Sequence, residues 1–191
     1  MKSHKHMQVF VLASLLIAVG TVIPMLMPKI IIGPMSFTLP SHVAVMIAIF
    51  ISPAVAIAVS LGTTLGFFMA GFPFVIVLRA LTHVIWAYLG AQYAKKNPQI
   101  FEKPLKTLQF NIVIALIHAL GEMIIVIPFY YGNGIDMQTF MYMIFGLVGL
   151  GTVIHSSIDF CLTLPVWKAL TQSHRIQGIS QVKKINLMKN A

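Results

Sequence analysis

The sequence predicts an all-α integral membrane protein, a single domain of residues 1–191 folded as one bundle of six transmembrane helices. Composition, the lengths of the apolar runs and the placement of basic residues support this prediction. The 191 residues are 58% hydrophobic and 9% charged, whereas soluble domains usually carry about 25% charged residues. The net charge of +9 does not indicate nucleic-acid binding, because the basic residues lie outside the apolar runs rather than in one patch.

Six apolar runs account for the predicted spans. A bilayer core needs about 20 apolar residues in a helix, and only helices or closed barrels satisfy their backbone there. The first run lacks an A-x-A-like cleavage site, which favours a retained span over a secretory signal. Ser52-Pro53 separates two short runs, which we interpret as two tilted helices rather than one kinked helix. The runs lie near residues 8–27, 41–52, 54–70, 74–94, 108–131 and 143–168.

The basic residues predict the orientation of the chain. Eleven of the thirteen Lys and Arg lie in the N-terminal segment, in the linker Lys95–Lys106 and from Lys168 onward, including a basic tail of residues 172–191. Such residues favour the cytoplasmic side, so both termini and the linker share that side only if the chain crosses six times. The loop between the first two spans contains three prolines and a glycine. We expect it to be an ordered, non-helical, lid-like loop on the outer face.

Small residues recur every four positions in the third predicted span, and a shorter set occurs in the first. Stripes of this kind let helices approach closely in lipid, and Gly62-x-x-x-Gly66 is the strongest part. The stripe is compatible with packing inside the bundle and with docking on a separate membrane protein. The candidate docking residues are Ala13, Ser14, Ala18, Ala54, Ala58, Gly62 and Gly66.

Pairs of ionisable residues interrupt the last three apolar runs. A charged residue at the centre of a bilayer costs at least ~2.5–3.5 kcal/mol, so such residues usually mark a site. A rise of ~1.5 Å per residue places Arg79 and Glu122 in the outer half, where they can meet. Each pair has four-residue spacing and therefore shares one helix face. The pairs are Arg79 with His83, His118 with Glu122, and His155 with Asp159, and His42 opens the second span.

Four functions are compatible with these polar residues. Histidine and carboxylate at four-residue spacing can bind Zn²⁺, although Arg79 would repel a cation. A proton-coupled carrier could use a relay of histidine and acid, but no inverted repeat is evident. An intramembrane hydrolase could use Ser156 or Ser157, but only adjacency in sequence to His155 supports it.

The fourth function is a subunit that binds a small molecule beneath the outer loops. Arginine suits a carboxylate, histidine suits a ring nitrogen, and aromatic side chains stack on a flat ring. No G-x-x-x-x-G-K-[ST] motif occurs, so ATP-driven work would need a partner. Cys161 is the only cysteine, which excludes a thiolate metal cluster. The candidate walls of the site are Phe37, Trp86, Phe129, Tyr130, Tyr131 and Tyr142.

Together with the six short spans, four stretches carry a resemblance to a known family. They are IGPMSFTLPSHV (32–43), FISP (50–53), GFPFVIVLRALTH (71–83) and GLGTVIHSSIDF (149–160). The chain resembles the substrate-binding (S) components of energy-coupling factor vitamin importers of bacteria, and the niacin type is the most similar. This resemblance implies a multi-pass protein of the cell membrane that is not an enzyme, with no catalytic residue, metal or cofactor and no nucleic-acid partner.

The resemblance also implies a mechanism and partners. S components bind a vitamin in an outer-half pocket, here through Arg79, His83, His118 and Glu122, with Phe37, Trp86 and Tyr131 as further contacts. His42, His155 and Asp159 are assigned as possible supporting residues of this binding site. The S component docks through small residues on a membrane transmission subunit, and two ATPases drive a toppling that carries the vitamin inward. Either a histidine is protonated beside an anionic vitamin, or Arg79 is free for the ligand and Glu122 pairs elsewhere.

Overall fold

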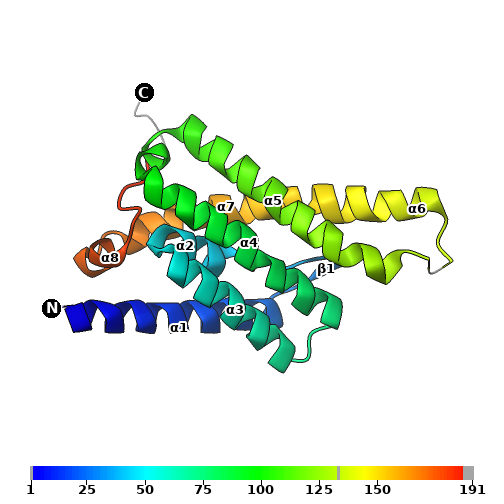
Figure 1. Cartoon of the computed structure of the whole chain (residues 1–191), viewed down its shortest axis with the longest axis horizontal. Coiled ribbons are helices and arrows are strands. Elements are labelled where there is room, and N and C mark those ends of the chain that lie inside the picture. Colours follow the sequence, from blue (N-terminus) through cyan, green and yellow to red (C-terminus); the bar gives the residue numbers. More distant parts are fainter. Residues whose placement is uncertain (1, 133, 187–191) are drawn as a thin grey trace.

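A computed structural model of the chain describes residues 2–132 and 134–186, and it is a bundle of helices with one small hairpin (Figure 1). Four helical segments are long and apolar enough to cross a membrane: His4–Leu26, Phe74–Lys96, Pro104–Tyr130 and Met137–Leu170. The prediction of a helical membrane protein is therefore confirmed to the extent of these four candidate spans. The helical elements are α1 (Lys2–Leu26), α2 (Val43–Ile51), α3 (Pro53–Met69), α4 (Phe74–Lys96), η1 (Pro98–Glu102), α5 (Pro104–Tyr130), α6 (Met137–Met141), the π-helical η2 (Tyr142–Leu150), α7 (Gly151–Leu170) and α8 (His174–Ile179).

Ser52 and Pro53 separate α2 from α3, as the sequence predicts. The extended backbone of Ser52 ends α2, and its hydroxyl accepts a hydrogen bond from the Val55 amide at 3.2 Å, which caps α3. Proline suits the first turn of a helix because its missing N–H would be unpaired there in any case. The nine residues of α2 span only about 14 Å, less than half of a hydrocarbon core of about 30 Å.

The loop between α1 and α2 is ordered and non-helical, as predicted, but it contains two strands that the all-helical prediction missed. Strands β1 (Ile30–Ile32) and β2 (Met35–Phe37) pair antiparallel, with Ile31 opposite Ser36. Gly33 turns the chain between them with a φ of +53°, a conformation that glycine adopts without steric cost. The hairpin therefore occupies part of the bundle that a longer second helix would otherwise fill.

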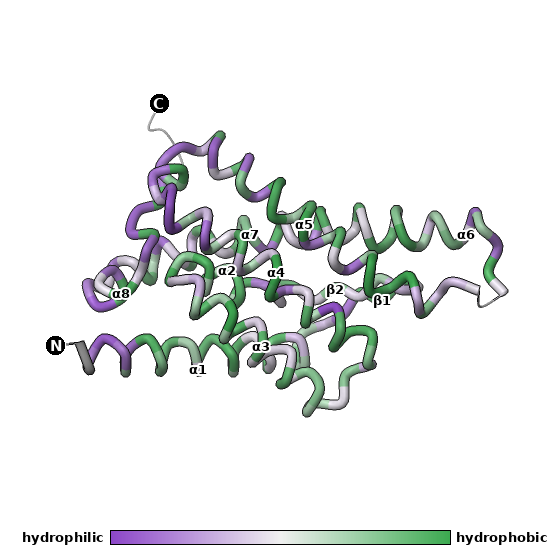
Figure 2. The backbone as a smooth tube through the Cα atoms, in the orientation of Figure 1, coloured by the Kyte–Doolittle hydropathy of each residue, from purple (hydrophilic) through white to green (hydrophobic). Residues whose placement is uncertain are grey.

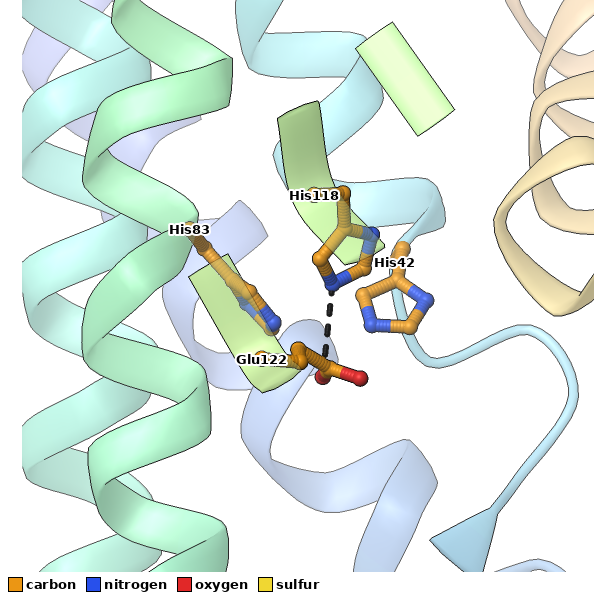
Figure 3. Close-up of side chains that lie close together, drawn as sticks. All are labelled: His42, His83, His118 and Glu122. Carbon is orange, nitrogen blue, oxygen red and sulfur yellow. Dashed lines mark ion pairs between the residues drawn. The ribbon is translucent and has the colours of Figure 1, made fainter. Parts of the chain in front are cut away.

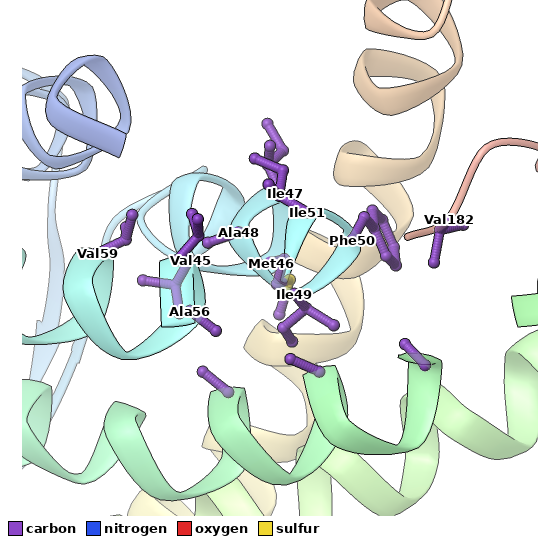
Figure 4. Packing of buried hydrophobic residues seen from close by; sticks show 14 of the residues in the cluster. Val45, Met46, Ile47, Ala48, Ile49, Phe50, Ile51, Ala56, Val59 and Val182 are labelled. Atoms are coloured by element: carbon purple, nitrogen blue, oxygen red, sulfur yellow. The ribbon is translucent and has the colours of Figure 1, made fainter. Parts of the chain in front are cut away.

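Helix α2 forms the centre of the hydrophobic core (Figure 4). All nine of its residues are buried, between α3, α4 and α7. The Phe50 ring packs against those of Phe101 at 5.1 Å and Trp167 at 5.4 Å. A helix that is apolar on every side is stable only inside a protein or a membrane, and here the surrounding helices cover it.

The segment after α8, part of the basic tail of residues 172–191, packs against the bundle at Gln181 and Val182. The side chain of Gln181 donates hydrogen bonds to the carbonyls of Ile49 at 2.6 Å and Ala91 at 2.9 Å. The amide of Val182 donates to the Phe50 carbonyl at 3.1 Å, and the Val182 side chain is fully buried. These bonds satisfy carbonyls at the C-terminal end of α2, which its own helix leaves unpaired. Residues 187–191, including Lys189, lie outside the described residues.

The basic segments gather at one end of the molecule. The start of α1, the connection between α4 and α5, and α8 lie together at the left of Figure 1, and Figure 2 shows hydrophilic residues concentrated there. The connections between α3 and α4 and between α5 and α6 lie toward the other end (Figure 1).

The small-residue stripe on α3 divides into two parts. A Cβ at Gly62 would lie 2.4 Å from Ile17, and one at Gly66 would lie 2.3 Å from Thr21, so both glycines pack against α1 within the chain. Ala54 and Ala58 on α3 are exposed, as are Ser14 and Ala18 on α1, whereas Ala13 is buried. Only the exposed members are accessible to another protein.

We predict that Gly62→Leu destabilises the chain itself, because the added side chain must displace Ile17 of α1. Overpacking of this kind costs about 1–3 kcal/mol, so the thermal unfolding midpoint in detergent should fall. Ala58→Leu on the exposed side of the same helix is the matched control and should leave the midpoint unchanged. Equal midpoints for the two variants would contradict the assignment of Gly62 to internal packing.

Candidate functional site

A cavity of about 150 Å³ lies between the β1–β2 hairpin and helices α1, α3 and α4. Apolar side chains such as Val45, Phe67, Phe72 and Ile76 form part of its wall. Its polar lining is Lys29, Ser36, Thr38, Ser41, His42, Thr63, Arg79, His83, Glu122 and His155. The cavity thus combines an apolar wall with a cluster of ionisable groups, which is typical of small-molecule sites.

Arg79 of α4 and Glu122 of α5 form a buried ion pair. The guanidinium Nη2 donates to Glu122 Oε2 at 2.8 Å, and Nη1 donates to the carbonyl of Pro34 in the hairpin turn at 3.1 Å. The Thr152 hydroxyl on α7 also donates to Glu122 Oε2. Arg79 and Glu122 are 5% and 3% exposed, so the pair joins two helices and the hairpin away from water. This bears out the expectation that the two residues meet.

Asp159 of α7 anchors the start of α2. Its Oδ2 atom accepts hydrogen bonds from the His42 amide and lies near His42 Nδ1, both at 2.9 Å. His155 Nε2, one turn earlier on α7, lies 3.3 Å from the same oxygen and 3.3 Å from the Thr38 carbonyl. Asp159 thus binds His42 as well as His155 of its own helix.

Four buried histidines from three helices and one loop lie in contact. The ring of His42 lies 4.9 Å from that of His83, 4.7 Å from His118 and 4.8 Å from His155, measured between centroids. Figure 3 shows His42, His83 and His118 arranged around the Glu122 carboxylate. Sequence reasoning assigned His42 to support, whereas the structure places it at the centre of the cluster.

Several buried polar atoms of this cluster have no hydrogen-bond partner within the described residues. They are Arg79 Nε, His83 Nε2, Trp86 Nε1, His118 Nε2 and Asp159 Oδ1. Unpaired buried polar groups are rare and costly in proteins. Arg79 and His83 line the cavity, whereas Trp86, His118 and Asp159 lie in the cluster beside it. The unpaired atoms of Arg79 and His83 therefore make the cavity a candidate site for a polar ligand.

The predicted aromatic contacts differ in their placement. Trp86 is buried with its ring 4.9 Å from that of His118, and the Phe37 ring lies 4.5 Å from that of His155. Tyr131 is 65% exposed, packs on Phe140 and does not line the cavity. Phe129, Tyr130 and Tyr142 do not line the cavity either, and Phe37 and Trp86 contact its histidine cluster without lining the cavity itself.

Sequence reasoning did not identify Thr38, Ser41, Thr152 and Ser156 as members of this network. Ser156 lies 3.3 Å from His118 Nδ1, and Ser41 contacts Asp159 at 3.5 Å. Short hydroxyl side chains occur throughout membrane helices, where they often bond to their own backbone. The one available signal was that Thr152, Ser156 and Asp159 repeat at helical spacing on the face of α7 that carries His155.

One curated protein resembles this chain along most of its length. The niacin transporter NiaX of Lactococcus lactis subsp. cremoris is 39% identical over 177 residues, which covers 92% of this chain and 80% of that protein. No family model matches the chain, and no solved structure matches it.

We predict that Glu122→Gln lowers the stability of the chain strongly, because it leaves the buried guanidinium of Arg79 without a carboxylate. Removing one partner of a buried ion pair costs about 3–5 kcal/mol, which thermal unfolding in detergent will measure. Asp136→Asn is the control: Asp136 is an exposed cap that accepts from the Thr139 amide at 2.9 Å, and asparagine caps helices equally well. Comparable unfolding midpoints for both variants would contradict the role of Glu122.

Proposed function

The chain belongs to the family of the niacin transporter NiaX, S components of energy-coupling factor vitamin transporters, and on this basis we propose that it binds niacin in the cavity beneath the hairpin. Membership makes it a multi-pass protein of a bacterial membrane and a transport protein rather than an enzyme. The observation that carries the proposed site is the pair of unpaired polar atoms, Arg79 Nε and His83 Nε2, on buried residues that line one cavity.

The size of the cavity suits a small aromatic ligand. Its volume is about 150 Å³, and a cavity of about that volume in another protein holds benzene. Nicotinate and nicotinamide are single six-membered rings with one small substituent. A ligand with two fused rings or a long side chain would require the hairpin or α4 to move.

Arg79 supports the assignment of the carboxylate or carboxamide end of niacin to its side of the cavity. Two of its nitrogens bond to Glu122 and to Pro34, while Nε has no partner among the described residues. An arginine oriented by such bonds presents its remaining donor in a fixed direction. The Trp86 indole N–H offers a further donor, and His83 Nε2 a further polar atom, within the same cluster.

The proposal includes six membrane crossings with both termini in the cytoplasm and the cavity in the outer half. The gathering of the basic segments at one end of the bundle supports this orientation (Figure 2). In this arrangement the hairpin and α2 together make the second crossing, with His42 near mid-depth. The hairpin then covers the cavity on its outer side.

Transport requires partners in this proposal. The exposed small residues Ser14, Ala18, Ala54 and Ala58 offer a surface on which a membrane transmission subunit can dock closely. Two ATPase subunits attached to that partner would supply the energy for toppling.

The proposal is tested by titrating the purified full chain with nicotinate, nicotinamide, thiamine, riboflavin, biotin and pantothenate in a calorimeter. We expect saturable binding of nicotinate or nicotinamide and none of the larger vitamins. Tighter binding of another vitamin, or no binding of either niacin form, would refute the proposal.

We predict that Arg79→Ala weakens nicotinate binding by at least about 30-fold, or about 2 kcal/mol, because an anchoring charge is lost. The single variant also leaves the buried Glu122 carboxylate without its arginine partner. The double variant Arg79→Met/Glu122→Leu avoids this because it removes both charges and keeps the core apolar. Both should lose affinity in the same titration. Arg175→Ala on the exposed surface of α8 is the control. Affinity within about twofold of the parent in the double variant would exclude Arg79 as an anchor.

We also predict that Ala58→Leu leaves nicotinate binding unchanged but lowers uptake several-fold in cells that make the partner subunits, because the larger side chain prevents close helix approach. Val113→Leu, on the exposed face of α5, is the matched control and should transport normally. Normal uptake with Ala58→Leu would show that docking does not use this surface.

A further inference from the structure

We infer that His42, His83, His118 and Glu122 bind a divalent transition-metal ion of the zinc class beside the cavity, which His42, His83 and Glu122 line. The four residues come from the start of α2, from α4 and from α5 (Figure 3). All four are buried, and one ligand atom from each lies within 4.8 Å of the others. Tetrahedral zinc with bonds of about 2.0–2.1 Å holds its ligand atoms about 3.3 Å apart, so small side-chain movements close the site.

The hydrogen bonds around the cluster leave the required nitrogens available. His42 Nδ1 lies 2.9 Å from Asp159 Oδ2, and a carboxylate can only accept, so Nδ1 carries the proton and Nε2 keeps its lone pair. Figure 3 shows the other ring nitrogen of His42 turned toward Glu122. A carboxylate that orients a ligating histidine in this way is characteristic of zinc sites.

The other two histidines repeat this pattern in part. His118 Nδ1 contacts the Ser156 hydroxyl at 3.3 Å, while its Nε2 faces Glu122 Oε1 at 3.4 Å without forming a hydrogen bond. His83 Nε2 has no partner among the described residues. Three imidazole nitrogens and one carboxylate oxygen therefore converge, a ligand set that suits zinc, nickel or cobalt.

Glu122 keeps the two positive groups apart. Its Oε2 atom is held by Arg79 and Thr152, which leaves Oε1 on the side of His118. A carboxylate shared in this way lowers the repulsion between the guanidinium and a nearby cation. The repulsion that disfavoured a metal on sequence grounds is thus offset by geometry.

The balance of buried charges is a second reason to expect a divalent cation. This reason rests on the proposed function, because it assumes that the ligand is nicotinate. With neutral histidines, the buried charges of the described network are one guanidinium and two carboxylates, Glu122 and Asp159. An anionic nicotinate would leave this low-dielectric region with two uncompensated negative charges, which is costly. One divalent cation restores neutrality.

Asp159 serves as an orienting group rather than as a ligand of a second ion. His42, His155 and Asp159 also lie within metal-binding distance of one another. However, Asp159 Oδ2 already receives the His42 amide and contacts His42 Nδ1 and His155 Nε2. A second ion here would compete with the first for His42.

The first experiment titrates ZnCl₂ into chelator-treated, untagged full chain that carries His4→Ala and His6→Ala, because these N-terminal histidines could bind metal. We expect one zinc per chain by calorimetry and elemental analysis, with zinc–nitrogen and zinc–oxygen distances of about 2.0–2.1 Å by X-ray absorption. His83→Gln and His118→Gln should each weaken binding at least about 10–100-fold, whereas His174→Ala, on the exposed face of α8, should not. No bound zinc, or equal binding in all variants, overturns the inference.

A variant outside the four proposed ligands distinguishes a loss of zinc binding at the site from a loss caused by misfolding. Ser156→Ala removes only the contact to His118 Nδ1 and should reduce zinc affinity about 10-fold or more while the unfolding midpoint without zinc stays near that of the parent. An unchanged zinc affinity in Ser156→Ala, together with unchanged affinity in His83→Gln, would contradict the site.

The second experiment measures nicotinate affinity with chelator and with one equivalent of ZnCl₂. We expect zinc to tighten nicotinate binding at least tenfold. Equal affinity in both conditions would refute the role of the metal in charge balance while leaving niacin binding intact. Absence of nicotinate binding in both conditions would refute the proposed function, and the zinc titration would still decide the metal site.

Discussion

Buried charge is the constraint on which the rest of this structure depends. Arg79, Glu122 and Asp159 lie in helices surrounded by apolar residues, and an unpaired charge in such surroundings costs several kcal/mol. Each is therefore bonded to a different segment: Arg79 to the hairpin and α5, and Asp159 to the start of α2. The ion pairs fix where α4, α5, α7 and the first loop meet, and the cavity is the space that this arrangement encloses.

The short second helix follows from the same constraint. Because α2 begins only at Val43, the hairpin before it stays non-helical and brings the Pro34 and Thr38 carbonyls to Arg79 and His155. A full-length helix would bond its carbonyls internally and offer none to these side chains. Strand β2 is buried or half-buried against the bundle, whereas strand β1 is exposed.

Much of this organisation was predictable, and the exceptions have physical causes. Long apolar runs, the Ser52-Pro53 break and the contact between Arg79 and Glu122 follow from hydropathy, proline chemistry and helical spacing, all of which act locally. The hairpin was missed because three-residue strands carry little signal. The central position of His42 and the partition of the Gly62 stripe depend on which helices become neighbours, and spacing along one helix does not contain that information.

Other segments hold both ends of helix α2 through hydrogen bonds. At one end, the His42 amide and ring are held by Asp159. At the other, the carbonyls of Ile49 and Phe50 are held by Gln181 and Val182, and the Trp167 indole donates to the Val182 carbonyl at 3.1 Å. Helix α7 supplies both Asp159 and Trp167. It is therefore linked to the start of α2 through Asp159 and, through Trp167 and Val182, to the end of α2. The segment after α8 and the histidine cluster therefore contact the same two helices, α2 and α7.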